Sequence, residues 1–322
     1  MHPLLFRPIY RRYLWGGSGF ATRLGRDLPP GDDYAESWEV VDRSADQSVV
    51  AAGPFAGRSL GELVRAHGAE LLGRHAGLAA FPLLFKFLDA RSDLSVQVHP
   101  DDARAALLDP PDRGKTEAWY VIDVAPGARL WAGLRAGTDR ERLAAALRSG
   151  RCDEVLHVVE PRPGDCIFVP AGTVHAIGAG LLVAEIQQSS DVTYRLHDWN
   201  RTGPDGKPRA LHVEAGLEAV TGFAPVAPAP RIPTDDPAAQ RLVDCPYFRL
   251  DEVRPGGPWD VGGDDRCHLL AVVGGEARLG DRWGLPALPL GTTLLLPAAI
   301  GRQTLHPAGP PGTTRILHVT LP

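Results

Sequence analysis

The chain has 322 residues, of which 44% are hydrophobic and 23% are charged, so it is long enough to bury the cores of two domains. Its net charge of −5 argues against a nucleic-acid partner. Apolar runs such as 291–297 are far shorter than the roughly 20 residues of a membrane span. The first residues lack a signal-peptide pattern, and the four cysteines form no CxxC pair. We therefore expect a cytoplasmic protein without a disulfide framework.

Glycine (36) and proline (30) are abundant, which favours short strands joined by tight turns. Amphipathic spacing predicts a helix at 59–73 with Ser59 as N-cap, and a second at 138–149 with Thr138 and Glu141 as a capping box. Two shorter helices are predicted at 103–108 and 213–221. We predict strands at 81–88, 94–98, 117–124, 156–159, 166–169, 181–186, 248–253, 268–273, 292–296 and 315–320.

A proline-rich segment divides the chain. Residues 226–240 have little periodicity and are predicted to be a linker between a larger unit, 1–225, and a smaller one, 241–322. A faint repeat links the two units, because a glycine, five residues and a proline occur at 164–170 and again at 291–297, around an apolar strand. This repeat favours two related β-barrels. The first copy continues to His175, where the second has Arg302, so only the first is expected to bind a metal.

Two short segments present polar pairs of the kind that metal sites need. Gln97 and His99 are two residues apart at a strand end, and so are Lys115 and Glu117 at the start of the next strong strand. Residues i and i+2 of a strand share one face. Taken alone, a histidine in such a place is more often structural, and a lysine with a glutamate more often a solvated ion pair.

The segment 164–175 is more specific. Its pattern, G-x5-P-x-G-x2-H, is similar to the second motif of cupin barrels and would present His175 at a barrel mouth. With His99 and Glu117 it supplies two imidazoles and a carboxylate, and Gln97 adds a neutral fourth ligand. Such N/O donors suit Zn²⁺, Fe²⁺, Mn²⁺ or Ni²⁺. At most four protein ligands leave positions for water or substrate, as in catalytic sites.

An arginine follows on a predicted strand at 193–198. Strand alternation would place Thr193, Arg195 and His197 on one face. An arginine beside a metal cavity suits an anionic substrate or developing oxyanion charge. A surface salt bridge is the alternative reading of this stretch.

The sequence resembles the short bacterial class I mannose-6-phosphate isomerases, a zinc-dependent cupin family. The supporting segments run in family order: 15–17 (WGG), 36–39 (ESWE), 94–102 (LSVQVHPDD), 114–117 (GKTE), 170–177 (PAGTVHAI) and 194–198 (YRLHD). The resemblance implies a mostly β fold of two cupin (jelly-roll) barrels with a small helical insertion. It implies one Zn²⁺ per chain, held by Gln97, His99, Glu117 and His175. Ala118 and His197 depart from the family, which has mostly cysteine and tyrosine there.

The same resemblance implies interconversion of mannose 6-phosphate and fructose 6-phosphate through a cis-enediolate. Lys115 is the leading candidate for the base, with a metal-bound water second. Arg195 would stabilise developing charge or the phosphate. Lys86 is either a phosphate contact or a strand-end lysine. Lys86 and Lys115 are two of only three lysines in a chain whose other strongly basic side chains are arginines, and a lysine can lose its proton when buried whereas an arginine cannot.

Three other functions stay open at this point: isomerisation of another phosphosugar such as glucose 6-phosphate, an Fe²⁺ oxygenase, and a sugar-responsive cupin without activity. Partner predictions are a small phosphosugar, with no nucleic acid and no membrane. The chain is expected to be a monomer or a homodimer.

Overall fold

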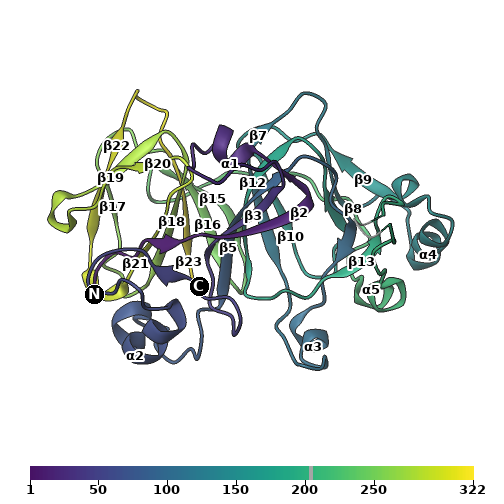
Figure 1. Ribbon diagram of the computed structural model, residues 1–322, viewed down its shortest axis with the longest axis horizontal. Coiled ribbons are helices and arrows are strands. Elements are labelled where there is room, and N and C mark those ends of the chain that lie inside the picture. Colours follow the sequence, from purple (N-terminus) through teal and green to yellow (C-terminus); the bar gives the residue numbers. More distant parts are fainter. Residues whose placement is uncertain (203–205) are drawn as a thin grey trace.

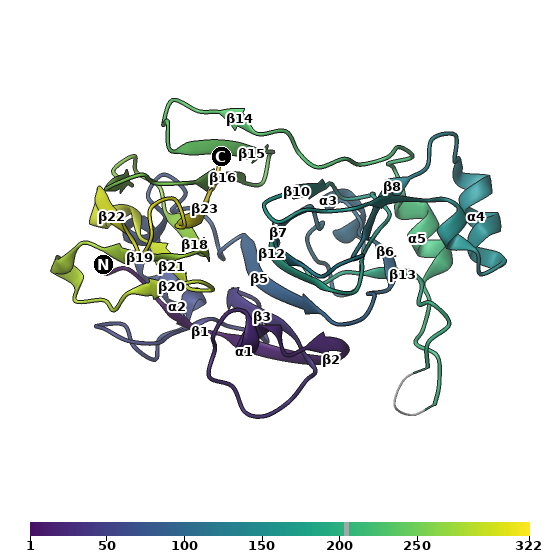
Figure 2. The ribbon, with the colours of Figure 1, turned by 90° about the horizontal axis from the view of Figure 1, so that it is seen from above.

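The protein is built mainly from β-strands. The computed structural model describes residues 1–202 and 206–322, and these form twenty-three strands, five α-helices and three 3-10 helices. The strands gather in two halves that lie side by side, with both termini in the half that contains β18 (Figures 1 and 2). The predicted mostly β class is confirmed.

The first half consists of two antiparallel sheets. The larger has the order β10 (Cys166–Val169), β7 (Glu117–Val124), β12 (Leu181–Gln188), β5 (Leu83–Ala90), β3 (Tyr34–Val40) and β2 (Ile9–Gly17). The smaller has the order β13 (Tyr194–His197), β6 (Val96–Val98), β11 (His175–Ile177), β8 (Leu130–Leu134) and β9 (Leu156–Val159). Buried side chains from both sheets, including Leu88, Trp119, Leu130 and Ile177, pack in one cluster. Burial of this apolar surface is what holds the two sheets together.

The second half repeats the plan. Its larger sheet has the order β14 (Ile232–Pro233), β15 (Ala239–Asp244), β16 (Arg249–Val253), β23 (Arg315–Thr320), β18 (His268–Gly274) and β21 (Thr293–Leu296). Its smaller sheet has the order β17 (Trp259–Val261), β22 (Gln303–Ala308), β19 (Glu276–Leu279) and β20 (Leu288–Pro289). That each pair of sheets closes into a barrel stays a prediction.

The sequence repeat occupies equivalent places in the two halves. Strands β10 and β21 each form the edge of a six-stranded sheet. Each is preceded by a glycine with positive φ, Gly164 at 96° and Gly291 at 86°. Left-handed backbone of this kind favours glycine because it has no Cβ. The repeat therefore marks the same turn and strand used twice.

The two halves share part of their core. One cluster contains Phe85 and Phe87 of the first half with Phe248 and Leu295 of the second. The N-terminal segment also crosses over, because Leu4 pairs with Leu295, and next to it β1 (Phe6–Arg7) pairs with β4 (Val49–Val50). The boundaries 1–225, 226–240 and 241–322 stay predictions.

Helices lie outside the sheets. Helix α2 (Leu60–Leu72) begins with the predicted cap, since the Ser59 side chain and the N3 residue Glu62 form a capping box. Helix α4 (Arg140–Arg148) is capped by Asp139, whose carboxylate accepts from the Arg142 N–H at 2.8 Å. The predicted capping box of Thr138 and Glu141 is therefore wrong by one residue, because the carboxylate of Asp139 satisfies the free N–H group instead.

The remaining helices are short. They are α1 (Gly19–Thr22), α3 (Asp102–Ala105), α5 (Val213–Ala219), η1 (Cys152–Glu154), η2 (Asp281–Trp283) and η3 (Ala298–Ile300). Helices α4 and α5 lie at the end of the molecule farthest from the termini (Figure 2). Their residues Leu143, Leu147 and Ala219 pack with Val96 and Trp131 of the five-stranded sheet. No helix in the described part of the chain has the length and hydrophobicity needed to cross a membrane.

Gly133 of β8 allows the chain to pass close to residues 224–226. It has φ 73°, and a Cβ there would lie 2.1 Å from the carbonyl oxygen of Ala224. Gly127 has a similar φ of 77° but no atom within 4 Å of a Cβ added there.

Gly127→Ala should lower the free energy of unfolding by about 1 kcal/mol through the left-handed backbone alone. Gly133→Ala should lower the free energy of unfolding by about 3 kcal/mol or more, because the backbone at Ala224 must also move to make room for the added Cβ. Equal losses in urea unfolding would contradict this packing.

Candidate functional site

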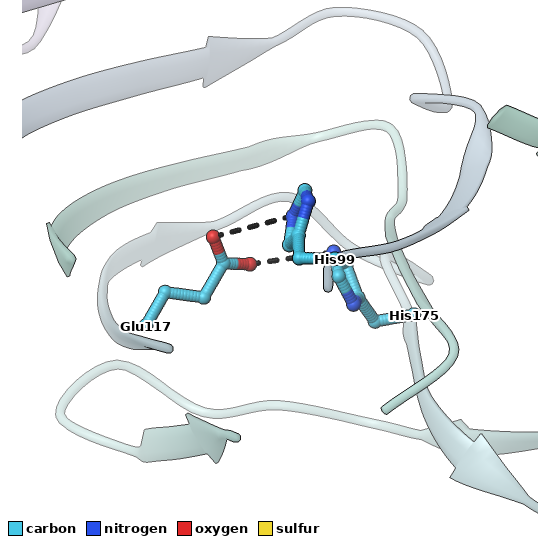
Figure 3. A group of neighbouring side chains, drawn as sticks. All are labelled: His99, Glu117 and His175. Atoms are coloured by element: carbon cyan, nitrogen blue, oxygen red, sulfur yellow. Dashed lines mark ion pairs between the residues drawn. The ribbon is translucent and has the colours of Figure 1, made fainter. Parts of the chain in front are cut away.

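Three of the four predicted metal-binding residues meet in the interior of the first half. His99 follows β6, Glu117 opens β7 and His175 opens β11. One ligand atom from each of the three lies within 4.8 Å of the others (Figure 3). The carboxylate oxygens of Glu117 are 3.6 Å from His99 Nε2 and 3.3 Å from His175 Nε2. Segments far apart in the sequence therefore bring together the donor set that the motifs predicted.

Hydrogen bonds fix the orientation of both imidazoles. His99 Nδ1 lies 2.8 Å from the carbonyl oxygen of Val192, and His175 Nδ1 lies 2.9 Å from that of Thr173. A carbonyl only accepts, so each Nδ1 carries the proton and each Nε2 keeps its lone pair. Burial lowers the pKa of His175 to about 3 and that of His99 well below its usual value, so both rings are neutral. Neutral imidazoles held in this tautomer are ready to bind a metal.

Glu117 is a buried carboxylate with one cation, Lys115, in contact with it. It is fully buried, and neither its two oxygens nor His175 Nε2 has a hydrogen bond of regular geometry among the described residues, although Lys115 Nζ forms an ion pair with Oε2. Burial raises the pKa of Glu117 to about 8; Lys115 opposes the rise, and the negative charge of Glu185 adds to it. A divalent cation would satisfy these atoms and keep the carboxylate ionised. The donor set therefore fits a metal such as zinc.

Lys115 is the nearest cation to this group. Its Nζ atom lies 2.8 Å from Glu117 Oε2 and 3.1 Å from His99 Nε2, and the side chain is buried. The structure thus places the predicted catalytic lysine directly against two of the predicted ligands.

A cavity of about 340 Å³ opens beside the cluster. Lys86, Gln97, Lys115, Glu117 and Arg195 line it, so five of the predicted site residues face one space. Gln97 is in register with His175 on one side and with Arg195 on the other. Its side chain lines the cavity, and its role as a metal ligand stays a prediction.

Arg195 stands at this cavity together with a second arginine, Arg209, that the sequence reading missed. Burial, together with the positive charge of Arg209, lowers the pKa of Arg195. The Arg209 guanidinium donates to Asp198 Oδ2 at 2.8 Å. Asp198 belongs to the 194–198 motif, but nothing in the sequence links it to a residue eleven positions later.

Lys86 also lines the cavity, within a buried charge cluster. Its Nζ is 2.9 Å from Glu185 Oε2 and 3.5 Å from Glu36 Oε2. Burial opposes the charged form, but these carboxylates outweigh it and raise the pKa of Lys86. Glu185 also accepts from Trp119 Nε1 at 3.2 Å. Glu185 was missed, although a charged residue inside the apolar strand 181–186 was a signal. Contact of Lys86 with substrate stays a prediction.

His197 does not share the face of Arg195. Thr193 and Arg195 line the cavity beside the metal-binding group, whereas His197 lines a different cavity with Trp131 and Trp199. The pairing of β13 with β6 shifts register between Arg195 and His197. A bulge of this kind adds a residue and reverses the alternation, so the prediction of one common face is wrong for His197.

Comparison with known proteins finds a matching family model and similar relatives. The family model of the type I phosphomannose isomerase catalytic domain matches residues 4–118. Mannose-6-phosphate isomerase ManA of Bacillus subtilis is 36% identical, over 94% of this chain and 96% of that protein. The mannose-6-phosphate isomerase of Streptococcus mutans is 35% identical, over 92% and 93%.

Solved structures show the same likeness. The crystal structure of the mannose 6-phosphate isomerase from Bacillus subtilis has a TM-score of 0.88 at 30% identity and covers 99% of both chains. The apo form of the Salmonella typhimurium enzyme has a TM-score of 0.77 at 18% identity, covering 100% of this chain and 99% of that one. At that identity the second likeness shows the fold alone.

The buried pair of Lys86 and Glu185 should contribute strongly to stability. Glu185→Gln keeps the shape but leaves the Lys86 ammonium buried beside Glu36 alone, and we expect it to lower the free energy of unfolding by about 3 kcal/mol. Glu276→Gln is the control, because Glu276 pairs with Arg278 at 3.8 Å on the surface and should change stability by less than about 1 kcal/mol. Urea unfolding of both variants measures the difference. Similar small changes in the two would contradict the assigned role of the buried pair.

Proposed function

The chain belongs to the type I phosphomannose isomerases, and from this membership we propose that it interconverts mannose 6-phosphate and fructose 6-phosphate with a zinc ion. The chain is thus an isomerase. The observation that carries the substrate and metal proposal is the buried group of His99, Glu117 and His175 beside a polar cavity.

Charge balance at the cavity supports a phosphosugar. Its lining contains four cationic side chains (Lys86, Lys115, Arg195 and Arg209) and four acidic ones (Glu36, Glu117, Glu185 and Asp191). The formal charges of these eight side chains therefore sum to zero. A bound divalent ion would add two positive charges to this lining, which favours an anionic substrate such as a phosphate monoester.

Gln97, His99, Glu117 and His175 would hold the metal. When bound, zinc supplies Lewis-acid polarisation of the sugar carbonyl and stabilises negative charge on the substrate oxygens. Glu117 contributes the one anionic ligand, and the Nδ1–H bonds of His99 and His175 keep their Nε2 lone pairs directed away from the backbone carbonyls.

Lys115 is proposed to move the proton between C1 and C2 of the substrate. It lines the cavity, and its Nζ lies close to both Glu117 and His99. An amine accepts a proton only in its unprotonated form, so this role requires the neutral amine of Lys115. The cis-enediolate formed in this way would keep both reacting oxygens on one side.

Arg195 is proposed to bind the phosphate or to stabilise developing charge. A guanidinium donates several N–H bonds in one plane, which matches phosphate oxygens. Asp198 holds Arg209 in place beside it. Lys86 is less suited to this role because two carboxylates already neutralise its ammonium. The cytoplasmic location and the state of monomer or homodimer are kept as predictions.

Activity should depend on the metal. A coupled assay with mannose 6-phosphate, following fructose 6-phosphate, should show turnover that a chelator abolishes and Zn²⁺ restores. Glucose 6-phosphate tested in parallel serves as the substrate control. Absence of mannose 6-phosphate turnover in folded, zinc-loaded protein would contradict the proposed function.

Lys115→Met should separate proton transfer from metal binding. The variant keeps a side chain of similar length and all four proposed ligands, so metal content should stay at one ion per chain. Loss of the base should lower kcat by about 10²–10⁴-fold. Metal analysis and steady-state kinetics on the same preparation provide both values. Full turnover by this variant would exclude Lys115 as the base.

A further inference from the structure

A second cavity, of about 380 Å³, lies apart from the catalytic one. It shares no lining residue with the cavity beside Glu117. Its volume is within the roughly 300–1,000 Å³ of small-molecule pockets and more than ten times the roughly 30 Å³ that one water occupies in the liquid. A single ordered water therefore does not account for it.

His197 places a buried, unsatisfied hydrogen-bond donor next to this cavity. The side chain is 7% exposed and lines the cavity. Its Nδ1 accepts from the backbone N–H of Trp199 at 3.2 Å. The proton of the neutral ring must then be on Nε2, an atom that is buried without a partner in the described part of the chain. Leaving such a donor unsatisfied is costly, so an acceptor is expected there.

The aromatic side of the cavity depends on an unusual backbone. Trp199 and Asn200, which both line it, have φ of 53° and 55°. Left-handed backbone is unfavourable for a bulky residue such as tryptophan and is concentrated at functional sites. The Trp199 ring is held by a bond from Nε1 to the carbonyl oxygen of Leu94 at 2.6 Å and packs against Trp131 at 4.8 Å between centroids. A half-buried, fixed indole results.

The charges around the cavity cancel. Two arginines, Arg129 and Arg135, and two carboxylates, Asp93 and Asp153, belong to its lining. No divalent metal group accompanies them among the described residues, in contrast to the catalytic cavity. A neutral ligand is favoured over a phosphate, because an anion would meet as many negative as positive groups.

We propose that this cavity is a second binding site, for a neutral hexose or a similar polyol. The C–H face of a sugar ring packs on an indole, while its hydroxyl groups both donate and accept. The Nε2–H of His197 and the two guanidinium groups supply donors, and the two carboxylates supply acceptors. The site goes beyond the proposed isomerase activity, since β13 presents Arg195 to one cavity and His197 to the other.

Isothermal titration of the full chain with D-mannose tests the proposal. The wild type should bind with a Kd on the order of 1 mM, as for a small ligand held by a few contacts. His197→Phe, which removes the donor and fills space, should weaken binding at least tenfold. Asp153→Ala should do the same; Asp153 is exposed, so this variant guards against misfolding of the first. Isomerase activity of Asp153→Ala should equal that of the wild type.

Arg195→Gln, on the other side of β13, is the matched control and should bind mannose as the wild type does. Loss of binding in Arg195→Gln with retention in the other two variants would place the sugar in the catalytic cavity and overturn the proposal. Absence of binding at 50-fold above the expected Kd would also overturn it. Inorganic phosphate that displaces mannose would overturn the choice of a neutral ligand.

Discussion

A carboxylate held out of water beside two neutral imidazoles is the constraint on which the site depends. Glu117 is fully buried, and burial raises its pKa to about 8. Lys115 is the cation in contact with it, at 2.8 Å. Burying an ionised carboxylate without compensation is far more costly than burying a neutral group. The arrangement is therefore poised for additional positive charge at one defined point, which a divalent metal would supply.

The sheets make this arrangement possible. Strand register places His175 opposite Gln97 and joins β12, which carries Glu185, to the strand that carries Glu117. Glu185 in turn holds Lys86 on β5. Lys86 thus has carboxylate partners on the two neighbouring strands, Lys115 pairs with Glu117 at the start of β7, and apolar clusters lie on both sides of the larger sheet. Burial strengthens the electrostatic interactions among these groups.

Much of the proposed site was predictable from sequence, because its residues fall in short local patterns. Two i, i+2 pairs each lie at one strand end: Gln97 with His99, and Lys115 with Glu117. The glycine and proline pattern in 164–175 predicts the position of His175. Glu185 and Arg209 were not found, since their partners are distant in the chain. His197 was misplaced because alternation along a strand does not reveal a bulge. The strands followed from composition and apolar runs, whereas the core shared between the halves depends on contacts such as Leu4 with Leu295 that no local pattern encodes.

The most direct test of the metal site is a crystal structure of the zinc-loaded protein with anomalous diffraction at the zinc edge. We expect one strong peak per chain, about 2.0–2.1 Å from the Nε2 atoms of His99 and His175 and within bonding distance of a Glu117 oxygen. A zinc-loaded crystal without a peak at this position, or with the peak bound elsewhere, would contradict the account.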